Sequence, residues 1–132
     1  MNQLAHLGKM ELLEREILKL PQAELVTRHY HAKGLYAREI VIPKGVMLTG
    51  MIHKFSQINI CCGDILIVTD EGRVRLTGYH TTVSPPGTKR GGFAYEETIW
   101  TTICSVPDDE TDIEKLEAYL VTNDMQLLQE NI

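Results

Sequence analysis

The central part of the chain, from Gly45 to Arg90, alternates short apolar and β-branched runs with turn signals. The turn signals are single glycines, Asp-Glu-Gly at 70–72 and Pro-Pro-Gly at 85–87. Short strands at this close spacing are typical of an antiparallel sandwich or barrel. The pattern therefore predicts a mainly β protein.

Two amphipathic segments flank the predicted strands. Apolar residues recur at helical spacing within residues 4–20, as on the buried face of a helix. Near the other end, Thr111 and Glu114 have the spacing of a capping box, which satisfies the free backbone amides of a helix start. We therefore predict one domain over 1–132, made of an N-terminal helix at 4–20, a β-barrel at 24–104 and an acidic C-terminal helix at 111–122.

The composition narrows the class of protein. A chain of 132 residues is long enough to bury a hydrophobic core. No apolar run approaches the roughly 18 residues of a membrane-spanning helix, and the N-terminal residues lack the apolar segment of a secretory signal. Cys61, Cys62 and Cys104 cannot all pair, and adjacent cysteines in an apolar strand are typical of free thiols in a reducing compartment. These features predict a cytoplasmic protein without a membrane partner.

Charge is distributed unevenly along a chain whose net charge is −5. Residues 28–90 hold nine lysines and arginines against four acids, whereas residues 108–132 hold eight acids and one lysine. One explanation is an acidic helix over a mildly basic body, which disfavours nonspecific contact with nucleic acid. The other is a basic pocket that receives a small anion. We expect no nucleic-acid partner.

A set of glycines and polar residues recurs at a recognisable spacing: Gly45, His53, Gly63, Pro85, Gly87 and Arg90. This spacing resembles the two motifs of the cupin superfamily. The first motif is a glycine, two histidines one residue apart, a glutamate and a closing glycine, and the second is Pro-x-Gly-x-x-His. The resemblance covers roughly residues 34–104. It implies a single antiparallel β-barrel of the jelly-roll type.

A wider pattern extends over nearly the whole chain. The segments 34–45, 49–55 and 84–90, followed by a Trp-Thr-Thr strand and an acidic helix, resemble small cupin-like proteins encoded by bacteriophages. That resemblance implies a phage origin, with the host cytoplasm or the virion as the place of action.

The departures from the cupin motifs concern the metal ligands. A metal-binding cupin uses three histidines and a carboxylate, because a divalent metal needs several converging nitrogen and oxygen donors. In this chain Phe55 stands at the second histidine position, and Arg90 stands at the late one. The glutamate position falls on Asn59 or Ile60. Arginine stays protonated and repels a cation, so we expect no metal or other cofactor at the usual cupin site.

Arginine at the late histidine position instead offers a planar fork of donors to a carboxylate or phosphate. We therefore predict a pocket for a small anionic or polar ligand, bound by Tyr36, Arg38, His53, Gln57 and Arg90. Lys54 points to the opposite face if its strand is regular, so it is the weakest candidate.

Plainer interpretations of these residues stay open. Arg38 and Arg90 could pair with rim acids such as Glu39, Glu96 and Glu97. His53 could be a hydrogen-bonded core histidine.

Three functions remain to be separated. The sequence favours a noncatalytic binding protein that forms a homo-oligomer, with a dimer as the first expectation and no catalytic residues. The first alternative is a metal-dependent isomerase or dioxygenase that draws its ligands from His29, His31, His53 and His80. The second is a structural or host-directed interaction protein, whose barrel would be filled by apolar side chains including Met47, Met51 and Phe55. No Gly-x-Ser-x-Gly elbow or phosphate-binding glycine loop is present.

Overall fold

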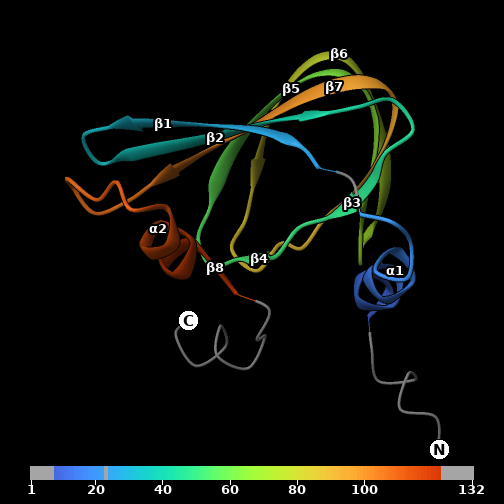
Figure 1. Cartoon of the computed structure of the whole chain (residues 1–132), viewed down its shortest axis with the longest axis horizontal. Helices are drawn as coiled ribbons and strands as arrows, with labels where there is room; N and C mark the ends of the chain where they lie inside the picture. Colours follow the sequence, from blue (N-terminus) through green and yellow to red (C-terminus); the bar gives the residue numbers. More distant parts are fainter. Residues whose placement is uncertain (1–7, 23, 123–132) are drawn as a thin grey trace, which may run out of the picture.

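The structure is a computed structural model that describes residues 8–22 and 24–122. Within these residues most of the chain is antiparallel β-structure, as the sequence predicts (Figure 1). The strands are β1 (Val26–Ala32), β2 (Leu35–Ile42), β3 (Met47–Thr49), β4 (Ile52–His53), β5 (Gln57–Thr69), β6 (Gly72–Ser84), β7 (Gly91–Ser105) and β8 (Val121–Thr122). The helices are α1 (Lys9–Ile17) and α2 (Ile113–Leu120). Neither helix is long or apolar enough to span a bilayer.

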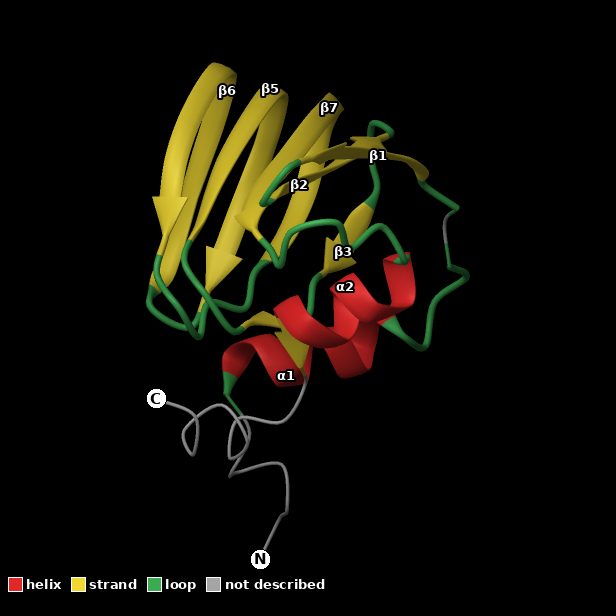
Figure 2. Cartoon of the chain, turned by 90° about the vertical axis from the view of Figure 1, so that its left-hand side faces the viewer, coloured by secondary structure: helices red, strands yellow, loops and turns green. Residues whose placement is uncertain are grey.

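One antiparallel sheet has the strand order β1-β2-β7-β5-β6, and β3 pairs with β7 beyond the end of β2. The long strands curve, and both helices lie on the same side of the curved sheet (Figure 2). A small second sheet pairs β4 with β8. The prediction of a mainly β, cupin-like architecture with two helices agrees with this arrangement.

Gly63 lies where β5 and β7 shift register, between Cys62 and Asp64. Its φ of +152° is rarely adopted by other residues, and an added Cβ would lie 2.6 Å from the carbonyl oxygen of Glu97. The amide of Asp64 donates to the hydroxyl of Thr98 at 3.1 Å and so fixes the bulge. The glycine that closes the first motif is therefore required by backbone geometry.

The buried side chains form two clusters on the inner face of the sheet. The larger cluster includes Ile42, Ile65 and Trp100, and the smaller one joins Tyr36 of β2 to Leu116 of α2. The strand residues of both clusters are inward-facing positions, which alternate along each strand, and α2 adds Leu116 and Leu120 to the smaller cluster.

In the scaffold alternative, Met47, Met51 and Phe55 would fill the barrel, as alternate residues of one strand can. The segment from Met47 to Phe55 breaks into β3 and β4, and Met47, Met51 and Phe55 remain 46%, 36% and 44% exposed. That condition of the scaffold alternative is not met, because alternation holds only within one regular strand.

The helices differ from the predicted segments at their ends. α1 lies inside the predicted 4–20 range, of which residues 4–7 lie outside the described part of the chain. At the start of α2, Asp112 and not Thr111 accepts the capping hydrogen bond, from the amide of Lys115 at 3.1 Å. Residues 121–122 were expected in the helix but form β8, because they pair with β4.

Candidate functional site

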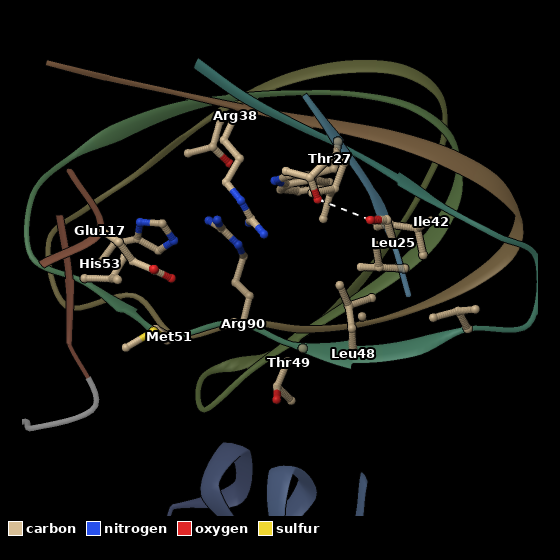
Figure 3. A pocket seen from close by; sticks show the side chains of 18 of the residues that line it. Leu25, Thr27, Arg38, Ile42, Leu48, Thr49, Met51, His53, Arg90 and Glu117 are labelled. Atoms are coloured by element: carbon tan, nitrogen blue, oxygen red, sulfur yellow. Dashed lines mark hydrogen bonds between the residues drawn. The ribbon is translucent and has the colours of Figure 1, made fainter. Parts of the chain in front are cut away.

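A cavity of about 840 Å³ lies between the inner face of the sheet and the two helices. Figure 3 shows that its labelled residues fall into two groups. Arg38, His53, Arg90 and Glu117 lie toward one end, and Leu25, Ile42 and Leu48 lie toward the other. Met51 lies with the first group and Thr27 with the second, so we call the end with the charged groups the polar end and the mostly apolar one the apolar end.

Strand register places a row of polar side chains across the sheet at the polar end. Direct cross-strand pairs join His29 to Arg38, Arg38 to Thr102, Thr102 to Asn59 and Asn59 to Thr82. Residues directly opposite one another in paired strands face the same side. Four neighbouring strands and the edge strand β6 thus present polar groups to one region of the inner face.

Backbone hydrogen bonds bring the two cupin-like motifs together. The amide of Gly87 donates to the carbonyl of His53 at 2.8 Å, and the amide of His53 donates to the carbonyl of Thr88 at 3.1 Å. The Pro-Pro-Gly bend is therefore fixed against β4. Since Arg90 follows this bend directly, its side chain starts close to His53.

The guanidinium of Arg90 rests on a group of buried neutral acceptors. It donates to the hydroxyl of Ser84 and, at 3.3 Å, to Oδ1 of Asn59. The side chains of Asn59 and Ser84 are 1% and 7% exposed, and Nδ2 of Asn59 donates to Oγ of Ser84 at 2.8 Å. Burial lowers the pKa of Arg90 to about 10, which leaves the group charged at neutral pH.

Gln57 links Arg90 to His53. Its amide satisfies both neighbours when the oxygen accepts from Nη2 of Arg90 at 2.7 Å and the nitrogen donates to Nδ1 of His53 at 2.8 Å. Nδ1 of His53 is then an acceptor, so a neutral His53 carries its proton on Nε2. Burial, together with the charges of Arg90 and Arg38, lowers the pKa of His53 to about 4. His53 is therefore a neutral hydrogen-bond donor at physiological pH.

Arg38 extends from β2 toward Arg90, with His53 beside them (Figure 3). Among residues 8–22 and 24–122, neither arginine forms an ion pair. Glu39 pairs instead with Arg28 at 3.4 Å, and Glu96 with Lys44 at 3.4 Å. The interpretation that rim acids neutralise the two arginines is not supported by the structure.

The remaining predicted ligand-binding residues take different places. Tyr36 lines the cavity, is 5% exposed and holds Nδ1 of His29 at 2.6 Å from its hydroxyl. Gln57 is 3% exposed and lies behind His53 and Arg90, so it positions these groups. Lys54 donates to the carbonyl of Ala118 at 2.9 Å and is absent from the cavity lining.

Several residues of the site were missed from the sequence. Glu117 lines the cavity from α2, Trp100 lines it from β7, and Asn59 and Ser84 form the buried support of Arg90. The one available signal was the inward alternation of polar Gln57 and Asn59 in a strand that is otherwise apolar. No sequence spacing places α2 over the cavity.

The donor set does not suit the divalent metal that many cupins hold. In the described part of the chain, no three His, Cys, Asp or Glu side chains gather as a metal site would require. His29 contacts the hydroxyl of Tyr36, His31 stacks on the ring of Tyr36 at 5.5 Å, and Nε2 of His80 lies 2.9 Å from the carbonyl of Thr77. His53 meanwhile has two guanidinium groups beside it, which repel a cation.

No family model and no curated protein matches the sequence. Solved structures of cupins, however, have a similar fold. A cupin superfamily protein from Desulfitobacterium hafniense matches with a TM-score of 0.53 at 11% identity, over 77% of this chain and 90% of that one. KdgF from Halomonas sp. matches with a TM-score of 0.53 at 19% identity, over 67% of this chain and 87% of that one.

A further match is the DMSP lyase DddQ from Ruegeria pomeroyi, with a TM-score of 0.52 at 15% identity over 67% of this chain and 49% of that one. Identities this low establish the fold and do not transfer an activity. The chain therefore has a cupin-like fold, and that prediction is confirmed.

Proposed function

We propose that this protein binds a small organic anion in its cavity without transforming it. The observation that carries the proposal is the relation of Arg38 to Arg90. The two guanidinium groups point toward one another in a cavity, and neither has an ion-pair partner among the described residues. An anion between them would supply the countercharge for both.

The energetics favour such a ligand. A charge held away from water without a countercharge costs several kcal/mol even after the protein relaxes. Arg90 carries this cost in the unliganded protein, because its partners Gln57, Asn59 and Ser84 are neutral. A carboxylate would accept paired N–H bonds from the guanidinium of Arg38, Nε2–H of His53 would add a second kind of donor, and Arg90 would contribute its charge.

The state of His53 supports binding rather than acid–base catalysis. A general base works best with a pKa near the operating pH. The pKa of His53 is lowered to about 4, and Gln57 occupies its Nδ1. His53 is therefore suited to donate a hydrogen bond and poorly suited to accept a proton.

The size of the cavity argues against the alternative in which the barrel serves only as a scaffold. Its volume of about 840 Å³ lies within the range of roughly 300–1,000 Å³ that is usual for small-molecule sites.

In our proposal the protein is phage-encoded and acts in the host cytoplasm as a homo-oligomer, with a dimer as the first expectation. The sequence resemblance to phage proteins supports that setting.

Calorimetric titration with acetate, butyrate, benzoate and inorganic phosphate at pH 7.5 tests the proposal. We expect saturable binding of at least one of these anions, and a loss of affinity of at least about tenfold in Arg38→Gln, as for a charge-assisted hydrogen bond. Arg38 is exposed, so this substitution preserves the core. Arg73→Gln removes the same charge from the exposed part of β6 and is the matched control.

The proposal would be overturned by an absence of binding for every anion in the titration. It would also be overturned if Arg38→Gln and Arg73→Gln bound with the same affinity as the unmodified protein.

A further inference from the structure

The cavity continues past the two arginines into an apolar region. Leu25, Ile42 and Leu48 line that region, and Figure 3 shows them on the side away from His53 and Glu117. Ile65 and Trp100 also line the cavity. A site that only held a small inorganic anion would not need this extension.

The apolar end is only partly covered by the protein's own side chains. Leu25, Val46 and Leu48 pack against the larger core cluster but remain partly exposed, while Ile42 and Ile65 beneath them are 2% exposed each. An apolar ligand body would remove this surface from water, which is favourable in proportion to the area covered.

The charges at the polar end indicate how much negative charge the ligand carries. Two arginines face the cavity, and Glu117 lines it as an acid without an ion pair in the described residues. Glu14 lines the other side but is held by Lys89 at 3.0 Å and by the hydroxyl of Thr49 at 2.8 Å. One net positive charge suits a monoanion better than a phosphate dianion.

We infer that the ligand is an amphiphilic carboxylate, with its carboxylate between Arg38 and Arg90 and its apolar chain against Leu25 and Leu48. This inference rests on the proposed function, and it adds the class of ligand. The two ends of the cavity carry separate parts of it: the arginines select the head group, and the apolar end selects the length of the chain.

The test is a homologous series of straight-chain carboxylates from acetate to decanoate, titrated by calorimetry at pH 7.5 below their aggregation concentrations. We expect affinity to rise roughly threefold to fourfold with each added methylene until the apolar end is filled. Alcohols of the same length should bind at least tenfold more weakly. Alkyl phosphates of the same length should also bind more weakly, and tighter binding of the phosphates would overturn the assignment to a carboxylate.

Trp100 supplies a second readout. It is the single tryptophan of the chain and lines the cavity, so its fluorescence reports on that region alone. Long-chain carboxylates should shift its emission maximum to shorter wavelength by more than acetate does. An emission maximum that stays fixed along the whole series would count against the inference.

Variants separate the chain from the head group. Leu25→Asn and Leu48→Asn should each flatten the dependence of affinity on chain length. Val83→Asn, at a 74% exposed position of β6, makes the same kind of change away from the cavity and should preserve the dependence. Leu25 lies just before β1, so Leu25→Asn does not change a residue of the sheet.

The outcomes distinguish the two proposals. If acetate binds and longer chains bind no better, the amphiphilic ligand is excluded while anion binding stands. If no member of the series binds, and benzoate and inorganic phosphate do not bind either, the proposed function itself fails. A dependence on length that persists in both leucine variants would also exclude the inference.

Discussion

The guanidinium carbon of Arg90 lies 5.2 Å from the centroid of the Trp100 ring. Stacking covers one face of the guanidinium, and hydrogen bonds to Ser84 and Gln57 fix its edge. The position of this positive charge is therefore set before a ligand arrives, which lowers the entropic cost of binding. A different cation at the same position would lack this preorganisation.

Arg90→Lys tests the contribution of the guanidinium shape. Lysine keeps the charge but cannot make the hydrogen bonds to Ser84, Asn59 and Gln57 together or offer the planar surface to Trp100, so the charge is held less firmly and we expect affinity for a carboxylate to fall roughly tenfold. Calorimetry on the variant measures the loss, with Arg73→Lys as the control for the same substitution on an exposed strand. Unchanged affinity in Arg90→Lys would show that only the charge of Arg90 matters.

Gln57→Glu should separate stability from binding. The introduced carboxylate would lie beside Arg90, where the amide oxygen of Gln57 lies 2.7 Å from Nη2. It would give Arg90 the countercharge that we assign to the ligand, so we expect anion affinity to fall at least about tenfold while the free energy of unfolding is maintained or raised. Urea unfolding and calorimetry provide the two measurements.

Gln57→Leu is the matched comparison for that experiment. It removes the hydrogen bonds to both His53 and Arg90, and should lower the free energy of unfolding by about 2 kcal/mol because buried polar groups lose their partner. If Gln57→Glu bound anions with the same affinity as the unmodified protein does, Arg90 would not be a ligand-binding residue.

His53 makes stability depend on pH. Its pKa is about 4 in the folded protein and about 6.5 in an unfolded chain. Between these values the unfolded state binds a proton that the folded state does not. The free energy of unfolding is therefore fully maintained above pH 6.5 and falls as the pH decreases toward 4, by on the order of 3 kcal/mol.

His53→Asn removes this titration and keeps an acceptor for the Gln57 amide. Urea unfolding of both proteins from pH 4 to pH 7.5 gives two curves, and their difference isolates His53. We expect the variant to lose less stability on acidification. Parallel curves would show that His53 titrates near its ordinary pKa in the folded protein.

Gly63 and Gly78 lie directly opposite each other on β5 and β6 but differ in their surroundings. A Cβ at Gly63 would lie 2.6 Å from the carbonyl oxygen of Glu97, whereas a Cβ at Gly78 would meet nothing within 4 Å. Gly63→Ala should lower the free energy of unfolding by more than about 3 kcal/mol, through both the clash and the positive φ. Gly78→Ala carries only the cost of its φ of +81°, about 1 kcal/mol. Equal losses in urea unfolding would contradict this explanation of the motif.

The parts of the fold that the sequence predicts are those that depend on local signals. Turn residues and alternation predicted the strands, and the late Pro-Pro-Gly predicted the bend before Arg90. The two ends of the predicted C-terminal helix show where local signals stop being sufficient. Asp112 and Thr111 are both good caps, and Val121 leaves the helix because β4 offers it a partner strand.

Four of the predicted ligand-binding residues line the cavity: Arg90 and His53 from the cupin-like motifs, and Tyr36 and Arg38 from a predicted strand. The backbone pairing of their segments explains why Arg90 and His53 lie together. Gln57 was predicted as a ligand contact but lies behind them, since its depth depends on side-chain packing. Glu117 was missed because Lys54 fixes α2 through the carbonyls of Ala118 and Leu120, a long-range contact that leaves no sequence signal.

The expected homodimer has a surface available on the outer face of the sheet. Register aligns two rows of mostly apolar side chains across five strands: Tyr30, Ala37, Ile103, Ile58 and Val83, and then Val26, Val41, Ile99, Cys62 and Tyr79. Val83 and Tyr79 are 74% and 69% exposed, so the rows reach the edge strand uncovered. A second copy packed face to face would cover both rows in each subunit, as the self-complementary surface of a two-fold dimer requires.

Two lysine substitutions on this face test the dimer. Ile58→Lys and Tyr79→Lys place a charge in the middle and at the edge of the apolar rows, and each should shift the mass measured by light scattering from dimer to monomer. Arg73→Lys, on the same edge strand but outside the rows, should leave the dimer intact. Ligand affinity should persist in the monomeric variants, because the cavity lies on the inner face. A dimer that withstands both substitutions must use another surface.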